Sequence, residues 1–148
     1  MYRHILVATD GSHTSAIALQ EGLKLARELR GQLLILHVVE TVNLNLDSEF
    51  IDPSDNWDAV RKSGEAVLAR AEAAAREAGI NARSKLVEID TMDRRIPEVI
   101  ADEAKAWPAD VIVIGTHGRR GISHLFLGSV AEGVVRVATK PVLLIRGK

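Results

Sequence analysis

The sequence contains no cysteine, so neither a disulfide framework nor thiolate chemistry is available to it. It also lacks a basic excess, because 19 Lys and Arg stand against 20 Asp and Glu, for a formal net charge of -1. Proteins that bind nucleic acid unaided normally carry such an excess, so DNA and RNA are not expected partners. No apolar run approaches a membrane span, and the run after Met1 is too short for a signal peptide. We therefore expect a cytoplasmic protein without a membrane or nucleic-acid partner.

The length of 148 residues and the hydrophobic content of 47% predict one globular domain over residues 1–148. Short, nearly continuous apolar runs, typical of strands buried on both faces of a parallel sheet, alternate with helical patterns. The predicted strands are 5–9, 33–39, 84–89, 111–114 and 142–145. The predicted helices are 13–30 with Ser12 as N-cap, 54–78 ending at Gly79, one with Pro97 in its first turn, and 129–138. This alternation predicts an α/β fold with helices on both faces of a parallel sheet.

The segment 41–53 is the one irregularity in this alternation. It is long and polar for a connection in a compact domain. Its composition fits a lid or a wandering loop, and we favour the loop. Its role does not follow from the sequence.

Glycines gather after the fourth predicted strand, at Gly115, Gly118, Gly121 and Gly128. Because glycine lacks a Cβ and tolerates positive φ, main-chain N–H groups can converge there on an anion. The spacing fits neither G-x-x-x-x-G-K-[ST] nor G-x-G-x-x-G. Asp10 follows the first predicted strand. If the first and fourth strands are neighbours, both groups share one crevice at the carboxyl ends of the strands.

The spacing Gly115-x2-Gly118-x9-Gly128-Ser129 resembles the ATP-binding pattern of the universal stress protein family. The segments 5–12, 36–39, 128–132 and 141–145 resemble signatures of the same family, in the same order. The resemblance therefore covers nearly the whole chain. It implies a single-domain, Rossmann-like, five-stranded sheet of order 3-2-1-4-5, with four helices on its two faces and the first and fourth strands side by side.

The resemblance also implies roles for individual residues. Adenine would lie against the main chain of the first two strands, and Asp10 would face the ribose hydroxyls or a phosphate-bound Mg²⁺. The glycine loop and Ser129 would hold the ribose and phosphates, which agrees with the N–H groups and partial positive charge at a helix N-terminus. The predicted ATP-binding residues are Ala8, Thr9, Asp10, Val38, Gly115, Thr116, Gly118, Arg119, Gly128, Ser129 and Val130. Turn geometry alone also explains glycines and an aspartate in such loops, and the family spacing favours ligand contact.

The predicted function is that of an ATP-binding regulator or sensor in the stress response, with unidentified protein partners. No carboxylate lies between Gly115 and Ala131 to act as a base, so binding is favoured over catalysis. One alternative is a slow ATPase or autophosphorylating enzyme that uses Asp10, Mg²⁺ and hydroxyls such as those of Thr116 and Ser123. A second alternative is a structural dimer that binds no nucleotide.

A homodimer is predicted from the last strand. In the family order this apolar strand lies at a sheet edge, where unpaired main-chain groups favour association. The resemblance implies that two copies pair through residues 141–146.

Overall fold

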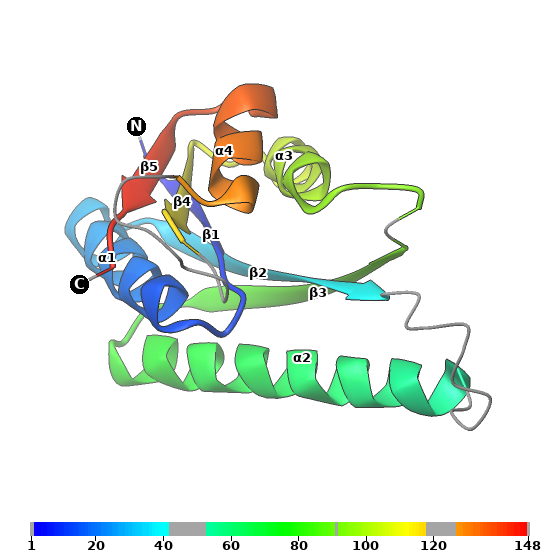
Figure 1. Ribbon diagram of the computed structural model, residues 1–148. Helices are drawn as coiled ribbons and strands as arrows, with labels where there is room; N and C mark the ends of the chain where they lie inside the picture. Colours follow the sequence, from blue (N-terminus) through cyan, green and yellow to red (C-terminus); the bar gives the residue numbers. More distant parts are fainter. Residues whose placement is uncertain (1, 42–52, 91, 118–126, 148) are drawn as a thin grey trace.

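Figure 1 shows the computed structural model, which describes residues 2–41, 53–90, 92–117 and 127–147. Strands and helices alternate along the described chain, as predicted. The elements are β1 (His4–Ala8), α1 (His13–Leu29), β2 (Gln32–Thr41), α2 (Pro53–Glu77), β3 (Ala82–Asp90), α3 (Ile96–Ala106), β4 (Val111–Gly115), α4 (Ser129–Val137) and β5 (Val142–Ile145). Most of the segment 41–53, whose role was left open, lies outside the described residues.

The five strands form one parallel sheet of order β3-β2-β1-β4-β5, which confirms the predicted order. Every residue of β4 is buried, as its continuous apolar sequence predicts. The largest boundary differences are of two residues: β2 ends two residues later than predicted, and β3 begins two residues earlier than predicted. Its first residue, Ala82, pairs with Leu33 of β2, so the ladder with β2 sets the strand's start and hydropathy does not.

Two hydrophobic cores lie on opposite faces of the sheet. Successive side chains of β1 point to opposite faces. Ile5 and Val7 pack in the core under α1 and α2, whereas Leu6 and Ala8 belong to the core under α3 and α4. Figure 1 shows the corresponding layers, with the α1–α2 pair below the sheet and the α3–α4 pair above it. The sheet is therefore covered on both faces.

Helix α1 ends in a left-handed residue that is not a glycine. Arg30 has φ 53°, and the N–H of Gly31 donates to the Ala26 carbonyl at 2.9 Å. Gly31 has a separate reason to be glycine, since a Cβ there would lie 2.8 Å from the Arg3 carbonyl oxygen. Close packing against the start of β1 therefore explains Gly31, and Arg30 carries the conformational strain of the turn.

The long elements β2, β3 and α2 extend together past the rest of the sheet (Figure 1). An ion pair joins α2 to β3 there, with Arg61 Nε 2.6 Å from Glu88 Oε1. The hydrogen bond from Arg61 lowers the pKa of the Glu88 carboxyl and raises that of the guanidinium. Among the described residues, no helix has both the length and the apolar character required to cross a membrane.

Candidate functional site

The carboxyl ends of β1 and β4 lie side by side, because these two strands pair in parallel. The chain leaves β1 toward α1 on one face and leaves β4 for the other face, where α4 lies (Figure 1). Ligands of open α/β sheets bind at such a reversal of strand order. The predicted residues Ala8, Thr9 and Asp10 thus lie at the same edge of the sheet as Gly115 and Thr116.

The turn from β1 to α1 satisfies its own hydrogen bonds through side chains. Asp10 Oδ1 accepts the Ser12 N–H at 2.8 Å, and Ser12 Oγ accepts the Ser15 N–H at 3.1 Å as the N-cap of α1. The Ser15 hydroxyl donates to the Ser12 carbonyl at 2.9 Å, so the Thr9 hydroxyl, 3.0 Å away, donates to Ser15 Oγ. Gly11 adopts φ 83°, which glycine tolerates best. Asp10 is therefore held in a rigid turn.

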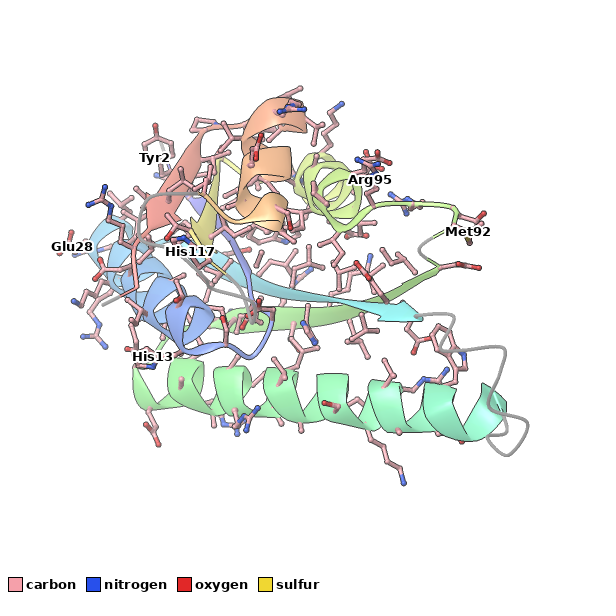
Figure 2. The ribbon with its side chains drawn as sticks, in the orientation of Figure 1. Tyr2, His13, Glu28, Met92, Arg95 and His117 are labelled. Atoms are coloured by element: carbon pink, nitrogen blue, oxygen red, sulfur yellow. The ribbon has the colours of Figure 1, made fainter. Side chains whose placement is uncertain are left out.

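The main chain of Thr116 connects three elements at the end of β4. Its N–H donates to the Ile145 carbonyl of β5 at 2.8 Å, and its carbonyl accepts the Gly128 N–H at 2.7 Å. Its buried hydroxyl lies 3.0 Å from His117 Nδ1. Figure 2 shows His117 in this region, beside β4 and the start of α4. One residue thus links the edge strand to the start of α4, through an N–H and a carbonyl that belong to successive peptide units.

Two of the predicted glycines are required by packing. A Cβ on Gly115 would lie 2.7 Å from Thr14 Cγ2 of α1, and one on Gly128 would lie 2.8 Å from the Thr116 carbonyl oxygen. Real Cβ atoms essentially never approach so closely. Both glycines therefore have a structural reason that holds without any ligand.

Helix α4 begins without a side-chain cap. Gly128, its N-cap, is extended with φ -64° and ψ 156°, and it has no side chain to bond the first turn. The N–H groups of Ser129, Val130 and Ala131 have no acceptor within the helix. Within the part of the chain that the structure describes, none of the three has a hydrogen-bond partner. Three donors and the partial positive charge of the helix thus open at the edge that carries Asp10.

The main chain of Val38 is directed to the same edge. The Thr9 N–H donates to the Leu36 carbonyl at 2.9 Å, so the main-chain groups of Leu36 face β1. By the alternation of a strand, those of Val38 face the same way. The ladder between β1 and β2 ends at the Ala8–Leu36 pair, and no hydrogen bond among the described residues joins the Val38 N–H to β1. Val38 therefore presents a donor and an acceptor beyond the end of β1.

Sequence reasoning missed His37, which is buried on the α2 face beside this edge. Its Nδ1 lies 2.7 Å from the Thr9 carbonyl oxygen. A carbonyl only accepts, so Nδ1 carries the proton. The available signal was a histidine inside the apolar run 33–39. Ser12 is the N-cap of α1, as predicted, whereas the bond from the Thr9 hydroxyl to Ser15 was missed. Its signal was the three-residue spacing of Thr9, Ser12 and Ser15 at a helix start.

A cleft of about 380 Å³ opens between the starts of α3 and α4. It shares Ser129 and Val130 with the uncapped turn of α4, and Arg95 lies on its α3 side (Figure 2). Its charge is mixed, since Arg94, Arg95 and Arg136 line it with Glu40 and Glu132. A ligand at the first turn of α4 thus has room to extend toward α3.

Two predicted residues, Gly118 and Arg119, lie outside the described residues. No group of three or more His, Cys, Asp or Glu side chains in the described part of the chain could hold a metal ion.

The fold defines a Rossmann-like α/β protein whose strand order reverses at the switch point between β1 and β4. Within that class, the chain belongs to the universal stress protein family, which it matches over residues 1–146. It is 34% identical over 155 residues to the universal stress protein YxiE of Bacillus subtilis, covering 99% of this chain and 100% of that protein.

Solved structures agree with this assignment. A universal stress protein family member from Burkholderia pseudomallei is 35% identical with a TM-score of 0.78, covering 97% of this chain and 96% of that one. The universal stress protein of Archaeoglobus fulgidus, solved in complex with dAMP, is 25% identical with a TM-score of 0.66, covering 97% and 98%. At least one similar member of the family thus binds a nucleotide.

Proposed function

We propose that this protein binds ATP at the carboxyl ends of β1 and β4 and acts as a nucleotide-dependent regulator or sensor in the stress response. The observation that carries the proposal is the contrast at this edge between a self-capped turn, which carries Asp10, and an uncapped α4. Three main-chain N–H groups of α4 have no partner among the described residues. Phosphate is the ligand that such donors favour. The dAMP complex of the Archaeoglobus fulgidus protein supports the same ligand class.

The main chain of Val38 supports adenine as the base. Its N–H and C=O lie on one side of β2, beyond the last pair between β1 and β2. Adenine carries a ring-nitrogen acceptor next to its amino donor, so one residue can satisfy both. Ala8 and Thr9 at the end of β1 would contact the same ring. We propose this arrangement for base binding.

The phosphates would be held by the main-chain N–H groups of Ser129 and Val130, with the Ser129 hydroxyl added. Gly128, whose own N–H donates to the Thr116 carbonyl, remains a predicted member of the site. Mg²⁺ is usually held by one or two carboxylates together with substrate phosphates, and Asp10 would supply the carboxylate. Bound there, Mg²⁺ would neutralise phosphate charge. Gly115 and Thr116 would flank the ribose, and Gly118 and Arg119 remain predicted members of the site.

Binding is favoured over hydrolysis because no carboxylate between Gly115 and Ala131 could act as a base. Asp10, whose Oδ1 accepts the Ser12 N–H, is assigned here to the turn and to the cation. Release of ADP that depends on the protein and disappears in Asp10→Ala would instead support a slow ATPase. A regulator further requires that ATP bind two conformations with different affinity.

We also propose a homodimer that forms through residues 141–146. Strand β5 is at the sheet edge, and Leu143 and Leu144 are 41% and 36% exposed. An apolar edge strand with unpaired main-chain groups favours strand pairing with a second copy. Analytical ultracentrifugation at micromolar concentration should give twice the mass of one chain. A species of single-chain mass alone would contradict the dimer.

The nucleotide is tested by denaturing freshly purified protein and identifying released compounds by mass spectrometry, followed by thermal unfolding with ATP, ADP and AMP. A ligand at 100 times its Kd adds about 2.7 kcal/mol to the free energy of unfolding if it binds only the folded state. That corresponds to several degrees of melting temperature for a domain of this size. If no nucleotide is released and millimolar ATP has no effect, the proposed function fails and the alternative of a structural dimer that binds no nucleotide is favoured. The cysteine-free composition is the support for placing this function in the cytoplasm.

A further inference from the structure

The hydrogen-bond ladder between β1 and β2 ends one bond earlier than the register of the two strands would allow. Thr9 donates to the Leu36 carbonyl, which makes His37 the register partner of Thr9. In a parallel ladder, the Thr9 carbonyl would next accept the N–H of Val38. In this protein the Thr9 carbonyl oxygen instead lies 2.7 Å from His37 Nδ1. The histidine ring thus takes the place of the next main-chain donor.

The surroundings of the ring hold it in this place. His37 lies on the α2 face of β2, 6% exposed. Gly64 of α2 lets the helix approach closely, since a Cβ there would lie 3.3 Å from His37 Cδ2 and 2.9 Å from Leu86 Cδ1. With Nδ1 protonated, the ring donates to a carbonyl that can only accept. The bond is buried and has little competition from water.

We propose that His37 is a positioning residue: its Nδ1–H takes the Thr9 carbonyl and thereby keeps the Val38 N–H directed to the crevice, available to a purine base. This inference rests on the proposed function and deepens it. A base would be recognised by the Val38 main chain, which is left unpaired because the His37 side chain ends the ladder between β1 and β2. The Thr9 side chain is also held, because its hydroxyl bonds Ser15 Oγ of α1. This second bond restrains rotation of the Thr9 carbonyl away from His37.

The first test needs no ligand. Solution NMR detects a scalar coupling across a hydrogen bond, here between the Val38 amide nitrogen and the Thr9 carbonyl carbon. The coupling should be absent in the wild type. It should also be absent in His37→Asn, whose amide nitrogen can occupy the Nδ1 position, and present in His37→Leu, which has the same branched shape without a donor. A coupling in the wild-type protein would overturn the proposal without reference to any variant.

The second test measures the Kd for ATP with Mg²⁺ by calorimetry, together with the melting temperature of each variant. His37→Asn should bind within about twofold of the wild type, and His37→Leu about five- to tenfold more weakly, the worth of one hydrogen bond. A melting temperature that stays near the wild type in His37→Leu separates positioning from a structural role. Equal loss in both variants, or wild-type affinity in His37→Leu, would refute the proposal.

The two proposals fail in different ways. If the wild type binds no ATP, the proposed function fails, the base-recognition role fails with it, and the couplings alone decide whether His37 ends the ladder. If the wild type binds ATP and His37→Leu binds equally well, only the role of His37 fails.

Discussion

The two turns that lead from strand to helix at the carboxyl edge of the sheet are built in opposite ways. The turn after β1 uses the side chains of Asp10, Ser12 and Ser15 to bond its own main chain. The start of α4, reached from β4, has a glycine N-cap with no side-chain cap, and the first N–H groups of the helix have no partner in the described chain. The turn after β1 thus consumes its own donors and is rigid, whereas the start of α4 leaves donors without a partner among the described residues, as an anion site requires.

The largest expected effect comes from giving α4 a negative charge of its own. Ser129→Asp places a carboxylate in the first turn, which favours the helix by about 0.3–1 kcal/mol. The same charge repels phosphate by about 1–4 kcal/mol, so the Kd for ATP should rise about five- to several-hundred-fold. Calorimetry and thermal unfolding measure the two effects. Ser129→Asn is the neutral control and should lose at most the contribution of the Ser129 hydroxyl, about two- to tenfold in Kd.

The opposite signs of the two effects make this prediction sharp. A variant that loses ATP affinity while its melting temperature holds or rises has lost a binding site and kept its fold. Undiminished affinity in Ser129→Asp would mean that the phosphates do not bind at the start of α4. The difference in capping between the two turns would then be unrelated to ATP binding.

The next effect tests the contact between the two turns. In Gly115→Ala the new Cβ meets Thr14 Cγ2 at 2.7 Å and the Thr14 main chain at 3.3 Å. Such overpacking typically costs about 1–3 kcal/mol of unfolding free energy, measurable by urea denaturation. Thr14→Ser removes the methyl group, so the double variant should recover part of the loss. Additive losses in the double variant would show that the two residues do not press on each other.

A smaller effect is expected from the cap of α1. Ser12→Ala removes the acceptor of the Ser15 N–H and should cost about 1 kcal/mol of stability. Its affinity for ATP should change less than twofold once the protein is folded, because this turn consumes its own donors. Ser12→Asp, which restores a capping oxygen, should regain the stability. A large loss of ATP affinity in Ser12→Ala would contradict this separation, because the turn after β1 would then contribute to binding as well as to stability.

The smallest effect concerns the amino edge of the sheet, which serves as a reference far from the crevice. The Asp110 carboxylate accepts the N–H groups of His4 and Arg3, each at 2.9 Å, and these bonds lower its pKa. The stability that it contributes is therefore present above the unfolded value of about 3.9 and is lost as pH falls through the lower folded pKa.

Asp110→Asn removes this pH-dependent part. The stability difference from the wild type should be largest near pH 7, should vanish in acid, and should stay below that of Ser12→Ala, since the carboxylate is partly exposed. ATP affinity should not change. Urea denaturation at pH 7 and pH 3 measures the difference, and a gap that widens in acid would contradict the assignment of the pKa.

The fold was largely predictable because burial and sequence pattern coincide. Apolar runs such as 111–114 are continuous because β4 is covered on both faces, and the strand order follows from the family resemblance. Strand ends were harder to predict. Ala82 belongs to β3 through its pairing with Leu33, and pairing across strands leaves no mark in a single stretch of sequence. The left-handed Arg30 likewise depends on the contact of Gly31 with Arg3.

The position of the candidate site could be predicted from the sequence, but the hydrogen bonds that hold its residues in place could not. Asp10, Thr116 and Gly128 lie at one edge, as expected from the strand order, and their contact with ATP stays a prediction. The bonds of Thr9 to Ser15 and of His37 to the Thr9 carbonyl were not foreseen. Both join polar atoms whose distance is set by tertiary structure, so composition and spacing do not reveal them.

The two main-chain bonds of Thr116 have a consequence for any signal that this protein transmits. Its N–H is bonded at 2.8 Å to the last residue of β5, and its carbonyl is bonded at 2.7 Å to the residue that starts α4. The two bonds belong to successive peptide planes that meet at the Thr116 Cα, so a single residue separates a displacement of the outer strand from a displacement of the helix start. Occupancy of the crevice and association through β5 would then share a single coupling free energy. By reciprocity, a second copy would raise or lower the affinity for ATP by the same factor that ATP applies to the dimer.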